Sequence, residues 1–314
     1  MSVKVYSTPE RVEEKKEKKK GFDIKRIKID IPMLSDDLEG GIPKRELILL
    51  TGPPGSGKTI TAIKILSDAI SQGMLTCYIS SEMTSYHVRM QARKLGIDLP
   101  KFQDFRPKKS EKLSISQPIF VDAYSFSQLS DIIKSEKGEE SKYVNPLNPS
   151  TLYRMFNELL SAVGKSAASE GKKKVGMLIV LDSTSPFIAR APSLARNMGV
   201  RLLSILRIYS SRPKKNENSR PSKKDEEKRA AVYTTVVATA QVSSTTGITY
   251  GFPLEHIASG IIVFDVIVPK KRGDVIERIA YIKKMRYTKH YMGTYDVLID
   301  YEAHGKRYPI YFNR

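Results

Sequence analysis

The stretch GPPGSGKT, residues 52–59, decides the fold of this 314-residue chain. It matches the pattern G-x-x-x-x-G-K-[ST] in full, which is the pattern of a phosphate-binding loop (P-loop). The apolar run ELILLTG (46–52) before it predicts a buried strand, and TITAIKILSDAISQG (59–73) after it has apolar residues at helical spacing. A strand, a glycine-rich turn and a helix, in that order, are the context that the motif requires.

The residue types of this loop suit a nucleoside triphosphate. Glycines let the backbone curl so that successive N–H groups point at phosphate oxygens, and the following helix adds its positive amino end. Lys58 is expected to reach the β- and γ-phosphates and act in catalysis, and the Thr59 hydroxyl is expected to ligate Mg²⁺. The alternative is a glycine-rich turn that merely contains Lys-Thr. The expected cofactors are ATP and Mg²⁺, and the expected nucleotide-binding residues are Gly52, Pro53, Pro54, Gly55, Ser56, Gly57, Lys58 and Thr59.

Strands and helices alternate along most of the remaining chain. Apolar runs predict strands at 75–80, 118–124 and 175–182, and helical spacing predicts helices at 86–96, 149–167 and 193–211. Further runs with strand character follow at 230–241, 260–268, 277–287 and 294–301. Strand–helix repeats with unbroken apolar strands predict an α/β fold, a mostly parallel sheet flanked by helices. The closing strands, joined by short turns, predict a C-terminal antiparallel extension.

Two acidic residues follow predicted strands. Asp182 ends VGMLIVLD (175–182), at the end of a strand where ligands sit in such folds, and is expected to hold the Mg²⁺ shell. A carboxylate that starts a turn or caps a helix is its alternative explanation. Glu82 follows LTCYIS (75–80) and is expected to orient or deprotonate the attacking water. Its alternative explanation is a carboxylate in the first turn of a helix.

Five blocks of the sequence, taken together, are typical of one protein family. They are LEGGIPKRELILLTGPPGSGKT, CYISSEMTSYHVRMQARKLGID, IVLDS, FPLEHIASGIIVF and IKKMRYTKHYMGTYDVLID. The last block, with its K-x-R-x-x-x-H pattern, is the most diagnostic. In these blocks nearly the whole chain beyond residue 22 resembles the KaiC-like branch of the RecA/RadA superfamily of ATPases. The resemblance implies a RecA-like P-loop core that binds ATP between subunits, in a homo-oligomer or with a partner of the RecA family.

The resemblance also assigns residues. Lys284, Arg286 and His290 match the basic residues that a neighbouring subunit supplies to the phosphates. Gln241 matches a γ-phosphate sensor, and a Gln that ends a strand is equally well explained as a residue that forms a hydrogen bond in a turn. Strand alternation puts Lys284 and Arg286 on one face, which suits a shared anionic target. A solvated basic strand edge that deters aggregation is the alternative. Met83 stands where KaiC-type proteins often carry a second glutamate, which argues against robust hydrolysis.

The charge of the chain is explained either by an anionic partner or by a lysine-rich solvated surface. Fifty-three Lys and Arg against 34 Asp and Glu leave a net charge of +19. RecA-like proteins grip single-stranded DNA with two loops, which here are 183–197 and 242–256. Candidate DNA-binding residues in them are Arg190, Arg196 and Tyr250, because basic groups bind phosphate and aromatic rings stack on bases.

One folded domain is expected over residues 22–314, preceded by a charged, disordered tail (1–21) and interrupted by surface insertions at about 134–148 and 211–229. The single cysteine excludes an intramolecular disulfide and a cysteine-built zinc site. We find no apolar run near the roughly 20 residues that span a bilayer, and no secretory leader, so a cytoplasmic protein without a membrane role is expected.

Two functions follow from these features. The first is an ATP-hydrolysing protein that acts on DNA as an accessory factor in recombination or repair. The second is a KaiC-type assembly or signalling switch that hydrolyses ATP slowly, has a protein partner and ignores DNA. The charge favours the first function, and Met83 favours the second. A small-molecule kinase is disfavoured, because no arginine-rich lid segment is evident.

Overall fold

A computed structural model describes residues 24–106, 113–123, 147, 149–187, 204–209, 229–241, 257–268, 276–300 and 309–314. Its helices are α1 (Leu34–Asp37), α2 (Lys58–Ser71), α3 (Ser85–Lys94), α5 (Pro149–Ser169) and the 3-10 helix η1 (Ser185–Phe187). Its first strands are β1 (Arg26–Lys28), β2 (Gly41–Pro43), β3 (Leu47–Gly52), β4 (Leu75–Ser80), β5 (Gln103–Asp104) and β6 (Ile119–Asp122). The later strands are β7 (Lys174–Asp182), β8 (Ala231–Gln241), β9 (Gly260–Ile267), β10 (Glu277–Met285), β11 (Thr294–Ile299) and β12 (Ile310–Asn313).

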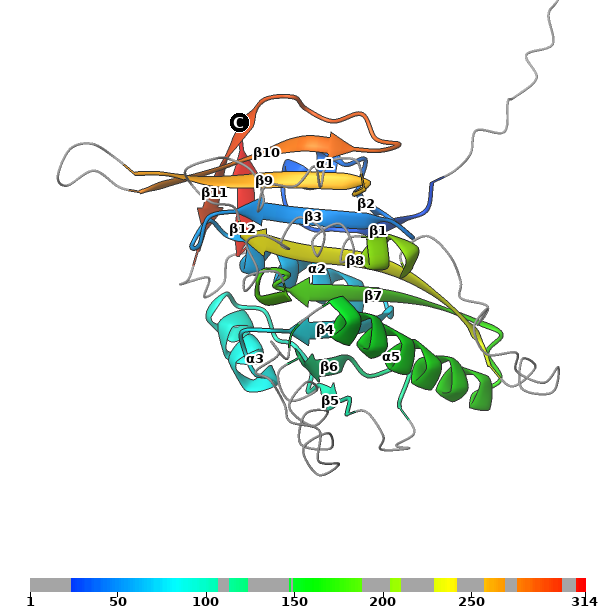
Figure 1. The fold of residues 1–314 in the computed structure, drawn as a ribbon. Helices are drawn as coiled ribbons and strands as arrows, with labels where there is room; N and C mark the ends of the chain where they lie inside the picture. Colours follow the sequence, from blue (N-terminus) through cyan, green and yellow to red (C-terminus); the bar gives the residue numbers. More distant parts are fainter. Residues whose placement is uncertain are drawn as a thin grey trace, which may run out of the picture.

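Ten of these strands form one sheet, in the order β12-β11-β10-β9-β3-β8-β7-β4-β6-β5 (Figure 1). From β9 to β5 neighbouring strands are parallel. From β9 to β12 they are antiparallel. The predicted α/β fold with a C-terminal antiparallel extension is confirmed. Strands β1 and β2 pair separately as a small antiparallel sheet.

Helices cover both faces of the parallel strands, which explains why β3 and β4 are buried along their whole length. Because side chains alternate along a strand, Leu49 and Leu50 of β3 enter different clusters. Leu49 belongs to the cluster that includes Phe156 of α5, and Leu50 to the one that includes Ile63 of α2. Figure 1 shows α5 in front of the sheet and α2 behind it. Among the described helices, none is long and apolar enough to cross a membrane.

Most predicted elements are found within a few residues of their expected bounds. The strand predicted at 277–287 ends instead at Met285, because Tyr287 has a φ of 62°, outside the range of a strand. Residues 204–209 of the helix predicted at 193–211 are described and helical. The tail 1–21 and most of both predicted insertions lie outside the described residues. The sequence pattern did not predict β1, β2, β5, β12 or α1, which are all short.

The direction of the strands decides which residues can meet. Strands β3, β4, β7 and β8 run the same way, so their carboxyl ends share one edge of the sheet. Strand β10 runs the opposite way, and its last residue, Met285, pairs with Gly260 at the start of β9. The end of β10 therefore lies at the amino edge of the parallel strands.

Candidate functional site

The P-loop leaves β3 at the carboxyl edge and enters α2, and its glycines are required by two features of the backbone. A Cβ atom at Gly52 would lie 2.3 Å from the main-chain oxygen of Phe264 on β9. Gly57, the residue before α2, has a φ of 106°, a region that side chains disfavour. The loop can therefore pack against β9 and turn into the helix only with glycine at these two positions.

Lys58 lies inside the loop, with 7% of its surface exposed. Its Nζ donates to the carbonyl oxygen of Pro53 at 2.6 Å and lies 3.5 Å from Ser56 Oγ. Burial lowers the pKa of Lys58, and the nearby carboxylates of Asp182 and Glu82 oppose that shift. A buried ammonium group inside a glycine cradle suits a phosphate ligand, which would replace the Pro53 carbonyl as its partner.

Asp182, at the end of β7, is 2% exposed and accepts three hydroxyl hydrogen bonds. The Tyr78 hydroxyl donates to Oδ2 at 2.6 Å, and Thr239 Oγ1 donates to Oδ1 at 2.5 Å. Thr59 Oγ1 donates to Oδ1 at 3.3 Å, so the two groups expected at Mg²⁺ lie side by side. Oxygen donors of this kind fit a magnesium ion, which is bound through a few protein oxygens besides substrate phosphates. The ligand roles themselves stay a prediction.

Tyr78 was not predicted from the sequence to belong to the site. It lies on β4, and burial raises the pKa of its hydroxyl, as does the charge of Asp182. The hydroxyl therefore stays protonated and donates to the carboxylate. A signal was present, since a tyrosine within the buried run LTCYIS needs a partner for its hydroxyl.

Glu82 is held at the same edge, two residues beyond β4. Ser183 Oγ donates to Glu82 Oε1 at 2.6 Å. Ser81 and Ser183 exchange two further hydrogen bonds of 2.9 Å, each using the Oγ atom of Ser81. These bonds join the ends of β4 and β7, so the carboxylates of Glu82 and Asp182 come from two strand ends that are fixed to one another. Glu82 is exposed, as a group that meets water must be.

Gln241 ends β8, beside the P-loop strand. Its register partner on β3 is Gly52, the first residue of the loop. Its main-chain N–H donates to Ser185 Oγ at 3.0 Å. The residue is therefore placed beside the start of the loop, and a role in sensing the γ-phosphate stays a prediction.

The three basic residues Lys284, Arg286 and His290 are not brought to this P-loop. Met285, between the first two, pairs with Gly260, which in turn pairs with Ile48 of β3. The P-loop begins four residues further along β3, about 13 Å away at 3.3 Å per residue. The basic residues thus lie at the amino edge of the sheet and the P-loop at the carboxyl edge.

His290 has one unusual feature. Its Nδ1 lies 3.2 Å from the carbonyl oxygen of Thr288, so Nδ1 is the nitrogen that donates. Its Nε2 is buried and has no hydrogen-bond partner among the described residues. A buried polar atom without a partner is costly, and because Nδ1 is the donor, the partner that Nε2 requires is a hydrogen-bond donor.

Arg278, near the start of β10, reaches the P-loop of its own chain. Its Nε donates to the carbonyl oxygen of Gly55 at 2.9 Å. This contact was not predicted from the sequence. The run ERIAYI (277–282) carries no signal for it, because the contact depends on how β10 pairs with β9. The DNA-binding candidates Arg190, Arg196 and Tyr250 lie outside the described residues.

Comparisons with known proteins agree with this architecture. The model of the KaiC ATPase family matches residues 27–211. A UPF0273 protein of Aeropyrum pernix is 27% identical over 271 residues, which cover 86% of this chain and 88% of that protein. A UPF0273 protein of Thermotoga maritima is also 27% identical over 271 residues, with 86% and 90% covered. The crystal structure of a KaiC-like protein from Pyrococcus horikoshii OT3 is similar in fold, with a TM-score of 0.56 at 20% identity over 93% of this chain and 100% of that one.

Proposed function

Because this chain belongs to the KaiC family of ATPases, we propose that it hydrolyses Mg²⁺-ATP at a site that a second copy of the chain completes. One observation carries the proposal. The P-loop lysine, the Thr59–Asp182 pair and Glu82 gather at one edge of the sheet, and the basic residues lie at the opposite edge.

Within one protomer the P-loop binds the triphosphate. Backbone N–H groups at the start of α2 face the phosphates, and Lys58 exchanges the Pro53 carbonyl for a phosphate oxygen. Thr59 and Asp182 would hold Mg²⁺, which when bound neutralises charge on the phosphates. Tyr78 and Thr239 keep the carboxylate of Asp182 oriented by donating to its two oxygens.

Glu82 prepares the attacking water. A carboxylate takes up a proton or orients a water by accepting its hydrogen bond, and Glu82 is exposed at the edge where the γ-phosphate would lie. Ser183 fixes one carboxylate oxygen, Oε1, by donation. The second oxygen, Oε2, is the one that we assign to the water. With Met83 in place of a second acid, we expect slow turnover.

The second protomer contributes the basic residues of the β10–β11 segment. They lie at the amino edge of their own sheet, so they reach a P-loop only if one copy stacks its amino edge on the carboxyl edge of the next. Such an interface joins two different surfaces and generates a ring or a filament. The positive side chains of Lys284 and Arg286 would then face phosphate.

Mixing two inactive variants tests the shared site. Lys58→Ala removes the P-loop lysine, and Arg286→Ala removes a group that acts on the neighbour. Each variant alone is expected to lose most hydrolysis, and a mixture is expected to recover, because about a quarter of the interfaces in a random mixture pair one intact P-loop with one intact arginine. A mixture no more active than its components contradicts the shared site.

For the anionic partner we propose single-stranded DNA. The net charge of +19 supports this proposal. DNA is expected to stimulate hydrolysis and to bind with an affinity that falls steeply as salt rises, since phosphate contacts release counterions. Hydrolysis indifferent to DNA, without salt-sensitive binding, would instead support the switch with a protein partner.

A further inference from the structure

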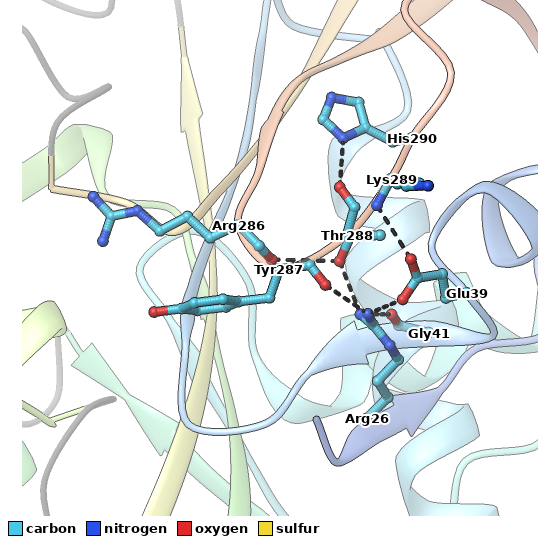
Figure 2. Close-up of polar contacts among 8 residues, drawn as sticks. All are labelled: Arg26, Glu39, Gly41, Arg286, Tyr287, Thr288, Lys289 and His290. Carbon is cyan, nitrogen blue, oxygen red and sulfur yellow. Dashed lines mark hydrogen bonds and ion pairs between the residues drawn. The ribbon is translucent and has the colours of Figure 1, made fainter. Parts of the chain in front are cut away.

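Residues Arg286 to His290 are called here the basic segment. This segment accepts hydrogen bonds from Arg26, a residue near the other end of the chain. Arg26 lies on β1 of the small sheet. Its guanidinium donates from Nη2 to the Tyr287 carbonyl oxygen at 3.0 Å and from Nη1 to Thr288 Oγ1 at 2.9 Å. Figure 2 shows the guanidinium pointing into the turn of this segment. The Arg26 side chain is only 11% exposed, so these contacts are partly shielded from water.

Glu39, in the turn between α1 and β2, forms a hydrogen bond with the same segment. Its Oε1 accepts from the main-chain N–H of Lys289 at 3.2 Å, and its Oε2 forms an ion pair with Arg26. The Lys289 N–H and Arg26 together lower the pKa of the Glu39 carboxyl. Arg26 and Glu39 are therefore one unit, which donates to one part of the main chain and accepts from the next.

The shape of the basic segment needs such support. Tyr287 has a φ of 62°, the left-handed region, which costs a residue with a side chain about 1–2 kcal/mol. The residue is 60% exposed, so packing of its side chain contributes little to holding this conformation. On either side, the Arg286 N–H donates to the Ser259 carbonyl at 2.9 Å and His290 Nδ1 donates to the Thr288 carbonyl. The strained residue between them is held by Arg26.

We propose that Arg26 and Glu39 are positioning residues, which fix the basic segment so that Arg286 and His290 meet the nucleotide of a neighbouring protomer. The inference rests on the proposed function, because it gives these two residues a purpose only if the basic segment acts in another copy. Neither residue touches the nucleotide. They act on the main chain of the segment and on the Thr288 hydroxyl, and a misplacement of about 1 Å is enough to slow catalysis by a large factor.

The kinetics of Arg26→Ala should separate positioning from general damage. The ATP-binding residues of the same protomer are untouched, so KM for ATP should change by less than about twofold, while kcat should fall about tenfold. Arg26→Lys keeps one charged donor group, so its kcat should lie between those of the native chain and Arg26→Ala. Lys28→Ala is the matched control, since it removes a positive charge from the same strand outside these contacts and should leave both constants unchanged.

Mixing experiments decide whether the effect crosses the interface. Arg26→Ala mixed with Lys58→Ala should recover hydrolysis, because the Lys58→Ala protomers supply correctly placed basic segments to the intact P-loops. If this mixture does not recover although Arg286→Ala with Lys58→Ala does, the positioning role is wrong and the shared site stands. If neither mixture recovers, the shared site is wrong and the positioning role fails with it. If Arg26→Ala does not fold, the same experiments use Glu39→Gln. That variant removes the ion pair with Arg26 but keeps an oxygen that accepts from the Lys289 N–H.

Discussion

At the scale of single residues, the hydroxyl donors around Asp182 matter most. Three hydroxyl groups from β4, β8 and α2 converge on one carboxylate that is almost fully buried. A buried carboxylate needs such donors, because each missing hydrogen bond leaves its charge uncompensated. Only Thr59 is well placed to exchange this contact for a metal, since Tyr78 and Thr239 come from strands inside the sheet.

Tyr78→Phe should therefore destabilise the protein and disturb the metal site. The ring still fills its volume, but Asp182 Oδ2 loses its donor, which should lower the free energy of unfolding by about 1–3 kcal/mol. The Mg²⁺ concentration for half-maximal hydrolysis should rise several-fold. Urea unfolding and a Mg²⁺ titration measure both effects. Tyr281→Phe on β10 is the control for loss of a hydroxyl, and equal effects of the two variants would contradict the role of Tyr78.

Glu39 predicts a pH dependence of stability. Its pKa in the folded protein is lower than its ordinary value of 4.5, so the fold favours the charged carboxylate. Its contribution is present above pH 4.5 and is lost as the pH falls through the folded pKa. The difference in unfolding free energy between the native chain and Glu39→Gln should thus be largest at neutral pH and shrink below pH 4.5. A difference that is constant down to pH 3 would contradict the contact with Lys289 and Arg26.

At the scale of elements, the P-loop depends on its fit between β3, β9 and α2. Gly52 closely approaches β9, whereas Gly55 has open space around its Cα. Both have positive φ, but only at Gly52 would a methyl group meet main-chain atoms that cannot move away cheaply. The two glycines therefore have separable functions, one for packing and one for the shape of the loop.

Gly52→Ala should lower the free energy of unfolding by more than about 2 kcal/mol, because strain in a left-handed conformation adds to a steric clash. Gly55→Ala should cost about 1 kcal/mol, for the conformation alone. Gly171→Ala is its matched control, since Gly171 has a φ of 74° and is equally open but lies after α5. Gly55→Ala should weaken ATP binding, whereas Gly171→Ala should not. Calorimetric titration with ATP and thermal unfolding give the comparison, and equal ATP affinities would contradict the assignment of the loop.

At the scale of the whole molecule, the sequence pattern predicted those features that depend on neighbouring residues in the chain. The period of apolar residues indicated the main strands and helices, and the P-loop was evident because its geometry depends on neighbouring residues only. The order of the strands was not predicted, and it is strand pairing that places Arg278 on its own P-loop and Arg286 at the opposite edge. The contact of Arg26 with Tyr287 joins residues 261 positions apart, which no local pattern reports. Short strands such as β1 and β12 have too few residues to show a period.

The proposed ATPase site is tested most directly by the rate of phosphate release from ATP. The rate is measured for the native chain, Lys58→Ala and Glu82→Gln, together with the ATP affinity of each. We predict slow Mg²⁺-dependent hydrolysis by the native chain and a loss of at least about 100-fold in both variants. Glu82→Gln should still bind ATP, and Lys58→Ala should bind it weakly. Phosphate release by the native chain no faster than by Lys58→Ala, or full activity in Glu82→Gln, would contradict the proposed ATPase site.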